Sequence, residues 1–127
     1  MNRLEGKKIL IVEDDNFLSQ MLAGKLLAEK ALVARAADGE AAIEMANLNR
    51  YDLVLLDILL PKKDGYAVLK ELKASDKTKS IDVIILSNLG QKTDVDMGIK
   101  LGAKKFLVKA LLSIDEIVEG VVENFIK

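Results

Sequence analysis

Four acidic residues follow two short apolar segments of the chain. They are Glu13, Asp14 and Asp15 after the run 9–12, and Asp57 after the run 53–56. Continuous runs of leucine and β-branched residues are typical of buried parallel strands, and ligand sites in open α/β sheets lie at the carboxyl ends of such strands. We therefore expect these carboxylates to lie together at one edge of one sheet.

Carboxylates brought this close repel one another and resist ionisation unless a cation neutralises them. Mg²⁺ prefers oxygen ligands and is usually held by one or two carboxylates, waters and a phosphate. The sequence therefore predicts a divalent metal beside these acids. Helix capping is the plainer alternative for Asp15 or Asn16. Capping explains Asp57 less well, because a carboxylate that ends four apolar residues needs a partner.

Two further polar residues end apolar segments. Ser87 ends the segment 82–87, and Lys109 follows the segment 106–108. Taken singly, they fit a turn hydroxyl and a solvated strand end. Together they would bring a hydroxyl and an ammonium group to the same sheet edge as the carboxylates. That set suits a phosphoryl group on a nucleophilic aspartate, with the acids holding the metal and the other two groups contacting phosphoryl oxygens.

Composition restricts the possible functions. A chain of 127 residues fits one domain, and its net charge of −1 gives no electrostatic case for binding nucleic acid or an anionic membrane. Cysteine and histidine are absent, which excludes disulfides, thiolate metal sites and an imidazole base. No apolar run approaches the roughly 20 residues that span a bilayer, and the first residues do not resemble a signal peptide. We expect a cytoplasmic location.

Strand-like and helix-like segments alternate along the chain. Strands are predicted at 8–12, 31–36, 53–56, 82–87 and 106–108, and helices at 16–30, 40–47, 66–75, 94–101 and from 113 onward. Asn16 is the expected cap of the first helix, and Ser113 and Glu116 have capping-box spacing in the last. Gly98 weakens the fourth helix by about 1 kcal/mol relative to alanine. Five successive βα units predict a doubly wound α/β fold, with helices on both faces of a parallel sheet.

The chain resembles a response-regulator receiver domain of the two-component family over essentially its whole length. Four motifs carry the resemblance: ILIVEDD at 9–15, LDILLPKKDG at 56–65, ILS at 85–87 and GAKKFLVK at 102–109. Each motif is weak alone, but their order and separation are specific. The resemblance implies a single receiver domain over residues 1–127. It also implies a three-layer sandwich of five helices and a five-stranded parallel sheet in the flavodoxin-like order 2-1-3-4-5.

The resemblance assigns roles at the acidic edge. Asp57 is implied to be the phosphoacceptor for a sensor histidine kinase. Glu13 and Asp14 would bind Mg²⁺ together with Asp57 and the backbone carbonyl of Leu59. The complete set would make the chain a phosphorylation-controlled switch that catalyses its own phosphorylation and dephosphorylation, and not a turnover enzyme.

The resemblance also assigns the switch residues. Ser87 would be the hydroxyl that moves to the phosphoryl group, and Phe106 the aromatic that turns inward behind it, although Phe106 also fits an ordinary core position. Lys109 would contact the phosphoryl oxygens, or Asp57 when it is unphosphorylated. The family usually has a proline after this lysine, joined by a cis bond, whereas this chain has Ala110. We expect the bond between Lys109 and Ala110 to be cis nevertheless, because that geometry aims the lysine at the site.

Partners follow from the same resemblance. A downstream protein is expected to bind the face built from the fourth helix, the fifth strand and the fifth helix, with the chain a monomer or a phosphorylation-dependent dimer. We expect no binding of nucleic acid or membrane by this chain. The chain ends with the predicted fifth helix, so it either signals through protein binding alone or belongs to a longer protein.

Three other functions compete with this one. An FMN-binding flavodoxin-like domain needs a loop rich in glycine and hydroxyls after the first strand, where Glu13 and its acidic neighbours would repel a phosphate. An aspartyl phosphohydrolase resembles a pattern with a general acid two residues after the nucleophile, where this chain has Leu59. A receiver-like scaffold that is never phosphorylated is the third alternative, and the complete acidic set argues against it.

Overall fold

One five-stranded parallel sheet organises residues 2–126, which the computed structural model describes. Its strands are β1 (Lys8–Val12), β2 (Leu32–Ala36), β3 (Leu53–Leu56), β4 (Asp82–Ser87) and β5 (Lys105–Val108). They lie in the order β2-β1-β3-β4-β5, and every neighbouring pair is parallel. The predicted fold class and strand order are therefore confirmed.

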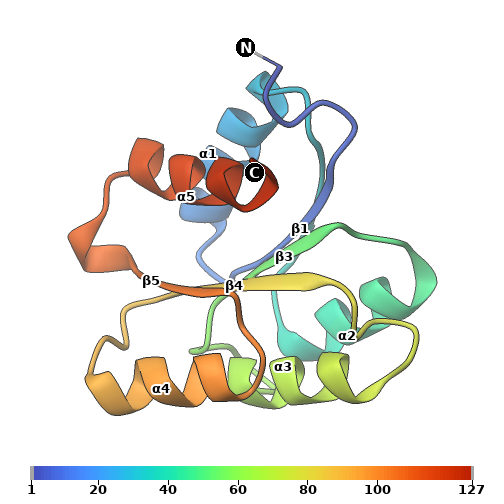
Figure 1. Cartoon of the computed structure of the whole chain (residues 1–127), viewed down its shortest axis with the longest axis vertical. Helices are drawn as coiled ribbons and strands as arrows, with labels where there is room; N and C mark the ends of the chain where they lie inside the picture. Colours follow the sequence, from blue (N-terminus) through green and yellow to red (C-terminus); the bar gives the residue numbers. More distant parts are fainter. Residues whose placement is uncertain (1, 127) are drawn as a thin grey trace.

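Helices cover both faces of this sheet. They are α1 (Asn16–Ala28), α2 (Gly39–Leu48), α3 (Gly65–Ala74), α4 (Lys92–Lys100) and α5 (Ile114–Phe125), with one 3₁₀ turn, η1 (Lys109–Leu111), before α5. Helices α1 and α5 lie on one face and α2, α3 and α4 on the other, so the molecule has three layers (Figure 1). None of the helices in the described part of the chain has both the length and the apolarity needed to cross a membrane.

Two hydrophobic clusters hold the layers together. Along β1, Ile9 and Ile11 belong to the cluster under α1 and α5, whereas Leu10 and Val12 belong to the cluster under α2 and α3. All four side chains are at most 1% exposed. The strand sequence is therefore apolar at every position, because both faces of the sheet are covered.

Local structure corrects two of the expected helix starts. Asp15, and not Asn16, caps α1: its side chain accepts a hydrogen bond from the backbone N–H of Leu18 at 3.2 Å. Helix α4 begins at Lys92, two residues earlier than expected. The capping box of α5 is confirmed, with reciprocal hydrogen bonds of 3.1 and 2.9 Å between Ser113 and Glu116.

Gly98 has a packing role that the propensity argument did not show. A Cβ at this position would lie 2.5 Å from Cδ1 of Ile85 and 3.1 Å from Cδ2 of Phe106. The missing side chain lets α4 approach the sheet closely. This contact explains why a poor helix former stands in the middle of α4.

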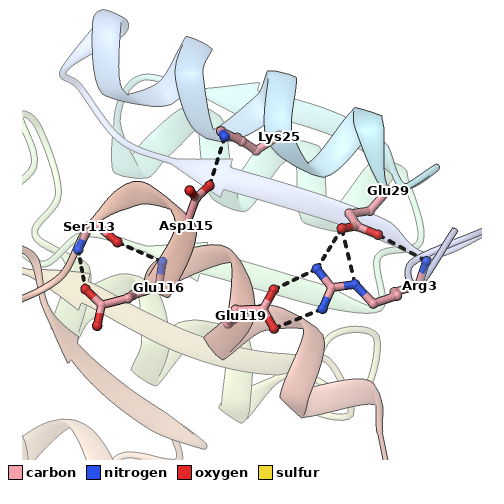
Figure 2. A network of polar contacts seen from close by, with 7 residues as sticks. All are labelled: Arg3, Lys25, Glu29, Ser113, Asp115, Glu116 and Glu119. Carbon is pink, nitrogen blue, oxygen red and sulfur yellow. Dashed lines mark hydrogen bonds and ion pairs between the residues drawn. The ribbon is translucent and has the colours of Figure 1, made fainter. Parts of the chain in front are cut away.

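A charged network ties the N-terminal segment to α1 and α5 (Figure 2). The guanidinium of Arg3 donates to Glu29 at 2.7 Å and to both carboxylate oxygens of Glu119, at 2.9 and 2.6 Å. Arg3 lowers the pKa of both glutamates. Lys25 and Asp115 form a second ion pair at 2.8 Å. These contacts fix α5 against α1 at two points along its length.

Two glycines in helices predict opposite effects of the same substitution. No atom lies within 4 Å of a Cβ added at Gly24 in α1, so Gly24→Ala should raise the free energy of unfolding by about 0.5–1 kcal/mol. A Cβ at Gly65 would lie 2.3 Å from the backbone oxygen of Asp57, so Gly65→Ala should lower it by about 1–3 kcal/mol. Urea unfolding measures both changes. A loss of stability in Gly24→Ala would contradict the open space beside α1.

Candidate functional site

The sheet brings three of the four acidic residues together. Glu13 follows β1 and Asp57 follows β3, and these strands pair so that Val12 lies opposite Leu56. Glu13, Asp14 and Asp57 each offer a carboxylate oxygen, and these oxygens lie within 4.8 Å of one another. Glu13 and Asp57 are only 5% and 4% exposed, whereas Asp14 is exposed. The remaining acid, Asp15, serves as the helix cap.

Backbone amides hold the two buried carboxylates in place. Oδ1 of Asp57 accepts a hydrogen bond from the N–H of Leu59 at 3.2 Å, and Oε2 of Glu13 accepts one from the N–H of Asp15 at 3.1 Å. Each bond uses one oxygen of its carboxylate. The second oxygen of each group contacts Lys109.

Lys109 supplies a positive charge between these carboxylates. Its Nζ lies 2.9 Å from Oδ2 of Asp57 and 2.5 Å from Oε1 of Glu13. Burial alone would lower the pKa of Lys109, but its contacts with Glu13 and Asp57 outweigh burial and raise the pKa. The lysine therefore stays charged. Burial raises the pKa of Glu13, although Lys109 and the Asp15 amide act in the opposite direction.

The acidic group fits a hard divalent cation. Oε1 of Glu13 is fully buried and, within residues 2–126, accepts no hydrogen bond; its contact with Lys109 is an ion pair without hydrogen-bond geometry. A hollow of about 260 Å³ borders Glu13 and Asp14 on the side of Arg35, away from Asp57. Three carboxylates whose oxygens lie within 4.8 Å of one another match the hard oxygen ligands that Mg²⁺ requires.

Gly65 holds the loop after β3 tightly folded, a role that sequence reasoning missed. Its N–H donates to the carbonyl of Ile58 at 2.8 Å. A Cβ here would also lie 2.6 Å from Cα of Ile58. The sequence signal for this role is the glycine itself, because only glycine permits so close an approach. The loop carries Leu59, whose amide contacts Asp57 and whose carbonyl remains a predicted ligand.

Ser87 and Phe106 lie at neighbouring strands but outside the charged cluster. Ser87 is fully buried at the end of β4, and its Oγ accepts a hydrogen bond from the N–H of Leu89 at 3.4 Å. Phe106 is half-buried, and its ring packs on the α3 side of the sheet and against Gly98. In this conformation the Ser87 hydroxyl is hydrogen-bonded within the loop that follows β4, and the Phe106 ring packs in the core. Their roles as switch residues remain predictions.

The prediction of a cis bond between Lys109 and Ala110 is wrong. All peptide bonds between residues 2 and 126 are trans. Lys109 instead begins η1, in which its carbonyl accepts a hydrogen bond from the N–H of Leu112 at 3.2 Å. A cis bond before a residue other than proline costs about 2.5–4 kcal/mol. This turn lets Lys109 reach Asp57 without that cost.

Sequence comparison decides the family of this chain. The model of the response regulator receiver domain matches residues 9–121. The chain belongs to this family. It is thus a receiver domain of two-component signalling, a family that binds Mg²⁺ at an acidic pocket.

Curated relatives are longer than this receiver domain. The chain is 40% identical over 103 residues to "Probable transcriptional regulator ycf27" of Cyanophora paradoxa, which covers 81% of this chain and 42% of the relative. It is 36% identical over 104 residues to the response regulator PleD of Caulobacter vibrioides, which covers 82% and 23%. The chain therefore spans less than half the length of either relative.

Solved structures match over nearly the full length of both chains. The Francisella response regulator 1452 receiver domain is 30% identical with a TM-score of 0.83, covering 96% of this chain and 100% of the other. A chain of the CheX–CheY–BeF₃–Mg²⁺ complex from Borrelia burgdorferi is 32% identical with a TM-score of 0.87, covering 97% and 92%. The PA1611 receiver domain from Pseudomonas aeruginosa, with magnesium in its active-site cleft, is 27% identical with a TM-score of 0.82, covering 94% and 96%.

The ion pairs of Lys109 predict the effect of removing its charge. Lys109→Met leaves two buried carboxylates without their cation, so the free energy of unfolding in metal-free buffer should fall by about 3 kcal/mol. Lys104→Met is the matched control. The Lys104 side chain is 60% exposed, and its ion pair with Asp82 is long, at 3.9 Å. The control should change stability by less than about 1 kcal/mol. If urea unfolding gave the same loss of unfolding free energy for both variants, Lys109 would not be the cation that stabilises the buried carboxylates.

Proposed function

We propose that this receiver domain is a binding switch controlled by phosphorylation of Asp57, with a sensor histidine kinase as the phosphodonor. The observation that carries the proposal is the contact of Lys109 with Asp57 inside the acidic group. A buried aspartate held beside an ammonium and two further carboxylates matches the needs of phosphoryl transfer. An aspartate with only a structural role would need the lysine as its ion-pair partner, but it would not need two further carboxylates beside it.

Phosphorylation exchanges one bond to phosphorus for another. An oxygen of Asp57 forms the new P–O bond while the P–N bond to the donor histidine breaks, and the nitrogen keeps the bonding electrons. The Nζ of Lys109 shifts from Oδ2 of Asp57 to a phosphoryl oxygen. The hydroxyl of Ser87, released from the Leu89 amide, donates to a second phosphoryl oxygen. In dephosphorylation, a water molecule would attack the phosphorus, the P–O bond to Asp57 would break, and the products would be inorganic phosphate and the free carboxylate. The same residues of this chain would serve both steps.

Mg²⁺ is the proposed cofactor of this step. Glu13, Asp14, Asp57 and the backbone carbonyl of Leu59 would hold it. Bound there, the metal would supply positive charge to the phosphoryl oxygens. Support comes from the buried Glu13 oxygen without a hydrogen bond and from the magnesium in the active-site cleft of the PA1611 receiver domain.

The output of the proposed switch is a change in partner binding. The candidate face consists of α4, β5 and α5, where Met97 and Ile99 of α4 are 48% and 46% exposed. A downstream protein would bind these apolar side chains. The Borrelia complex gives a precedent, because CheX and CheY are bound together there in the presence of BeF₃ and Mg²⁺.

Asp57→Asn tests the acceptor directly. An amide is nearly isosteric with the carboxylate but a poor nucleophile, so labelling by acetyl phosphate should be abolished while the circular dichroism spectrum is kept. Intact-mass spectrometry measures the addition of one phosphoryl group. Asp76→Asn is the control, because the side chain of Asp76 is 96% exposed, and this variant should label normally. Full labelling of Asp57→Asn would assign the acceptor to another residue.

Magnesium should stabilise the protein through binding to the folded state. At 100 times its dissociation constant the gain in unfolding free energy is about 2.7 kcal/mol. Replacing both Glu13 and Asp14 by alanine should remove this gain, as measured by thermal unfolding with and without Mg²⁺. Asp15→Asn removes a charge from the same loop but keeps the helix cap, and it should retain the gain. A magnesium-dependent shift that persists in the double variant would place the metal elsewhere.

A further inference from the structure

Helix α4 is weakly attached to the rest of the molecule. Gly98 is the only buried residue among its nine, and it contributes no side chain. Met97 and Ile99, its largest apolar residues, are about half exposed. An element with so few buried apolar side chains opens or shifts at low free energy. The position of α4 therefore depends on a small number of specific contacts.

One of these contacts is a hydrogen bond from the neighbouring helix. The hydroxyl of Tyr66, in the first turn of α3, donates to the backbone carbonyl of Asp94 in the first turn of α4, at 2.9 Å. Helices α3 and α4 lie side by side under the same face of the sheet (Figure 1). Burial raises the pKa of Tyr66, and Asp94 and Asp64 add to this rise. The hydroxyl therefore keeps its proton and donates throughout the neutral range.

Both ends of this bond connect to the phosphorylation site. Tyr66 directly follows Gly65, which packs against the backbone oxygen of Asp57. At the other end, residues 88–91 join Ser87 to α4, and Asp94 and Gln91 form the capping box that begins the helix. The loop itself is fastened by the 3.4 Å bond between Ser87 and Leu89. The bond from Tyr66 thus joins the loop after Asp57 to the helix after Ser87.

We propose that Tyr66 is a positioning residue that holds the first turn of α4 in the arrangement of the unphosphorylated protein. The inference rests on the proposed function, because it takes Ser87 to move toward a phosphoryl group on Asp57. That movement breaks the Ser87–Leu89 bond and draws residues 88–91 with it. The Tyr66–Asp94 bond resists the movement and biases the equilibrium toward the inactive arrangement. A ligand that requires the active arrangement must overcome this bias.

Tyr66→Phe removes the hydroxyl and keeps the ring, so it isolates the hydrogen bond. Two quantities are measured: amide hydrogen exchange of α4 by NMR in metal-free protein, and the affinity for beryllofluoride in the presence of Mg²⁺. One neutral hydrogen bond shifts an equilibrium about fivefold, which corresponds to about 1 kcal/mol. The variant should exchange α4 amides about fivefold faster and bind beryllofluoride about fivefold more tightly, with the exchange of the other helices unchanged.

Tyr51→Phe is the matched control, because the chain contains only these two tyrosines. Tyr51 is 9% exposed, and its side chain lines a hollow formed with Arg50 and Asp82, at the opposite ends of the strands. Tyr66 donates a hydrogen bond to Asp94 of α4, whereas within residues 2–126 the Tyr51 hydroxyl makes no hydrogen bond to α4. The control should leave α4 exchange and beryllofluoride affinity as in the wild type.

Three results would overturn the role of Tyr66. They are unchanged α4 exchange in Tyr66→Phe, faster exchange spread evenly over all helices, and unchanged or weaker beryllofluoride affinity. Failure of the proposed function would look different: the wild-type protein itself would then not bind beryllofluoride with Mg²⁺. The exchange measurement on metal-free protein would still report whether the hydrogen bond holds α4.

Discussion

The site depends on neutralising buried negative charge. Glu13 and Asp57 have side chains that are only 3% and 5% exposed, and a carboxylate taken out of water is costly without a partner. Lys109 reaches both of them from the end of β5, which lies two strands from β3 and three strands from β1. Like-charge repulsion alone suggested a metal, but the structure shows that a lysine already supplies one cation. The acidic group holds three carboxylates and this one lysine, and a second cation would neutralise the negative charge that remains.

This arrangement requires the fold as a whole. Glu13, Asp57 and Lys109 follow β1, β3 and β5, which are joined into one sheet through β4. Their convergence depends on the parallel register, and the register depends on burying apolar side chains on both faces. The network of Arg3, Glu29 and Glu119 fixes α5 on one face (Figure 2). On the other face, α4 has only one buried residue, Gly98. The ion pairs thus hold one face of the sheet, and the helix with the least buried surface lies on the other.

Much of this could be predicted from sequence, because strands covered on both faces leave apolar runs and the charged residues stand at their ends. The sequence was less informative where long-range packing decides. Gly98 reads as a weak helix position, yet its contact with Ile85 and Phe106 joins residues that are far apart in the chain. Asp15 and Asn16 both suit a helix cap, and only the backbone path selects Asp15. The cis bond was inferred from family geometry, and the turn η1 that replaces it follows from local hydrogen bonding.

Phosphorylation would disturb the charge arrangement and not the core. A phosphoryl group on Asp57 adds negative charge at a point where Lys109 is shared with Glu13, so the lysine cannot satisfy both as before. The sheet cannot adjust, because its strands are buried on both faces, and α5 is tied to α1 by ion pairs. The part free to respond is the loop after Ser87 and the helix it leads into. Under the proposed function, the weak attachment of α4 would let a signal leave this site.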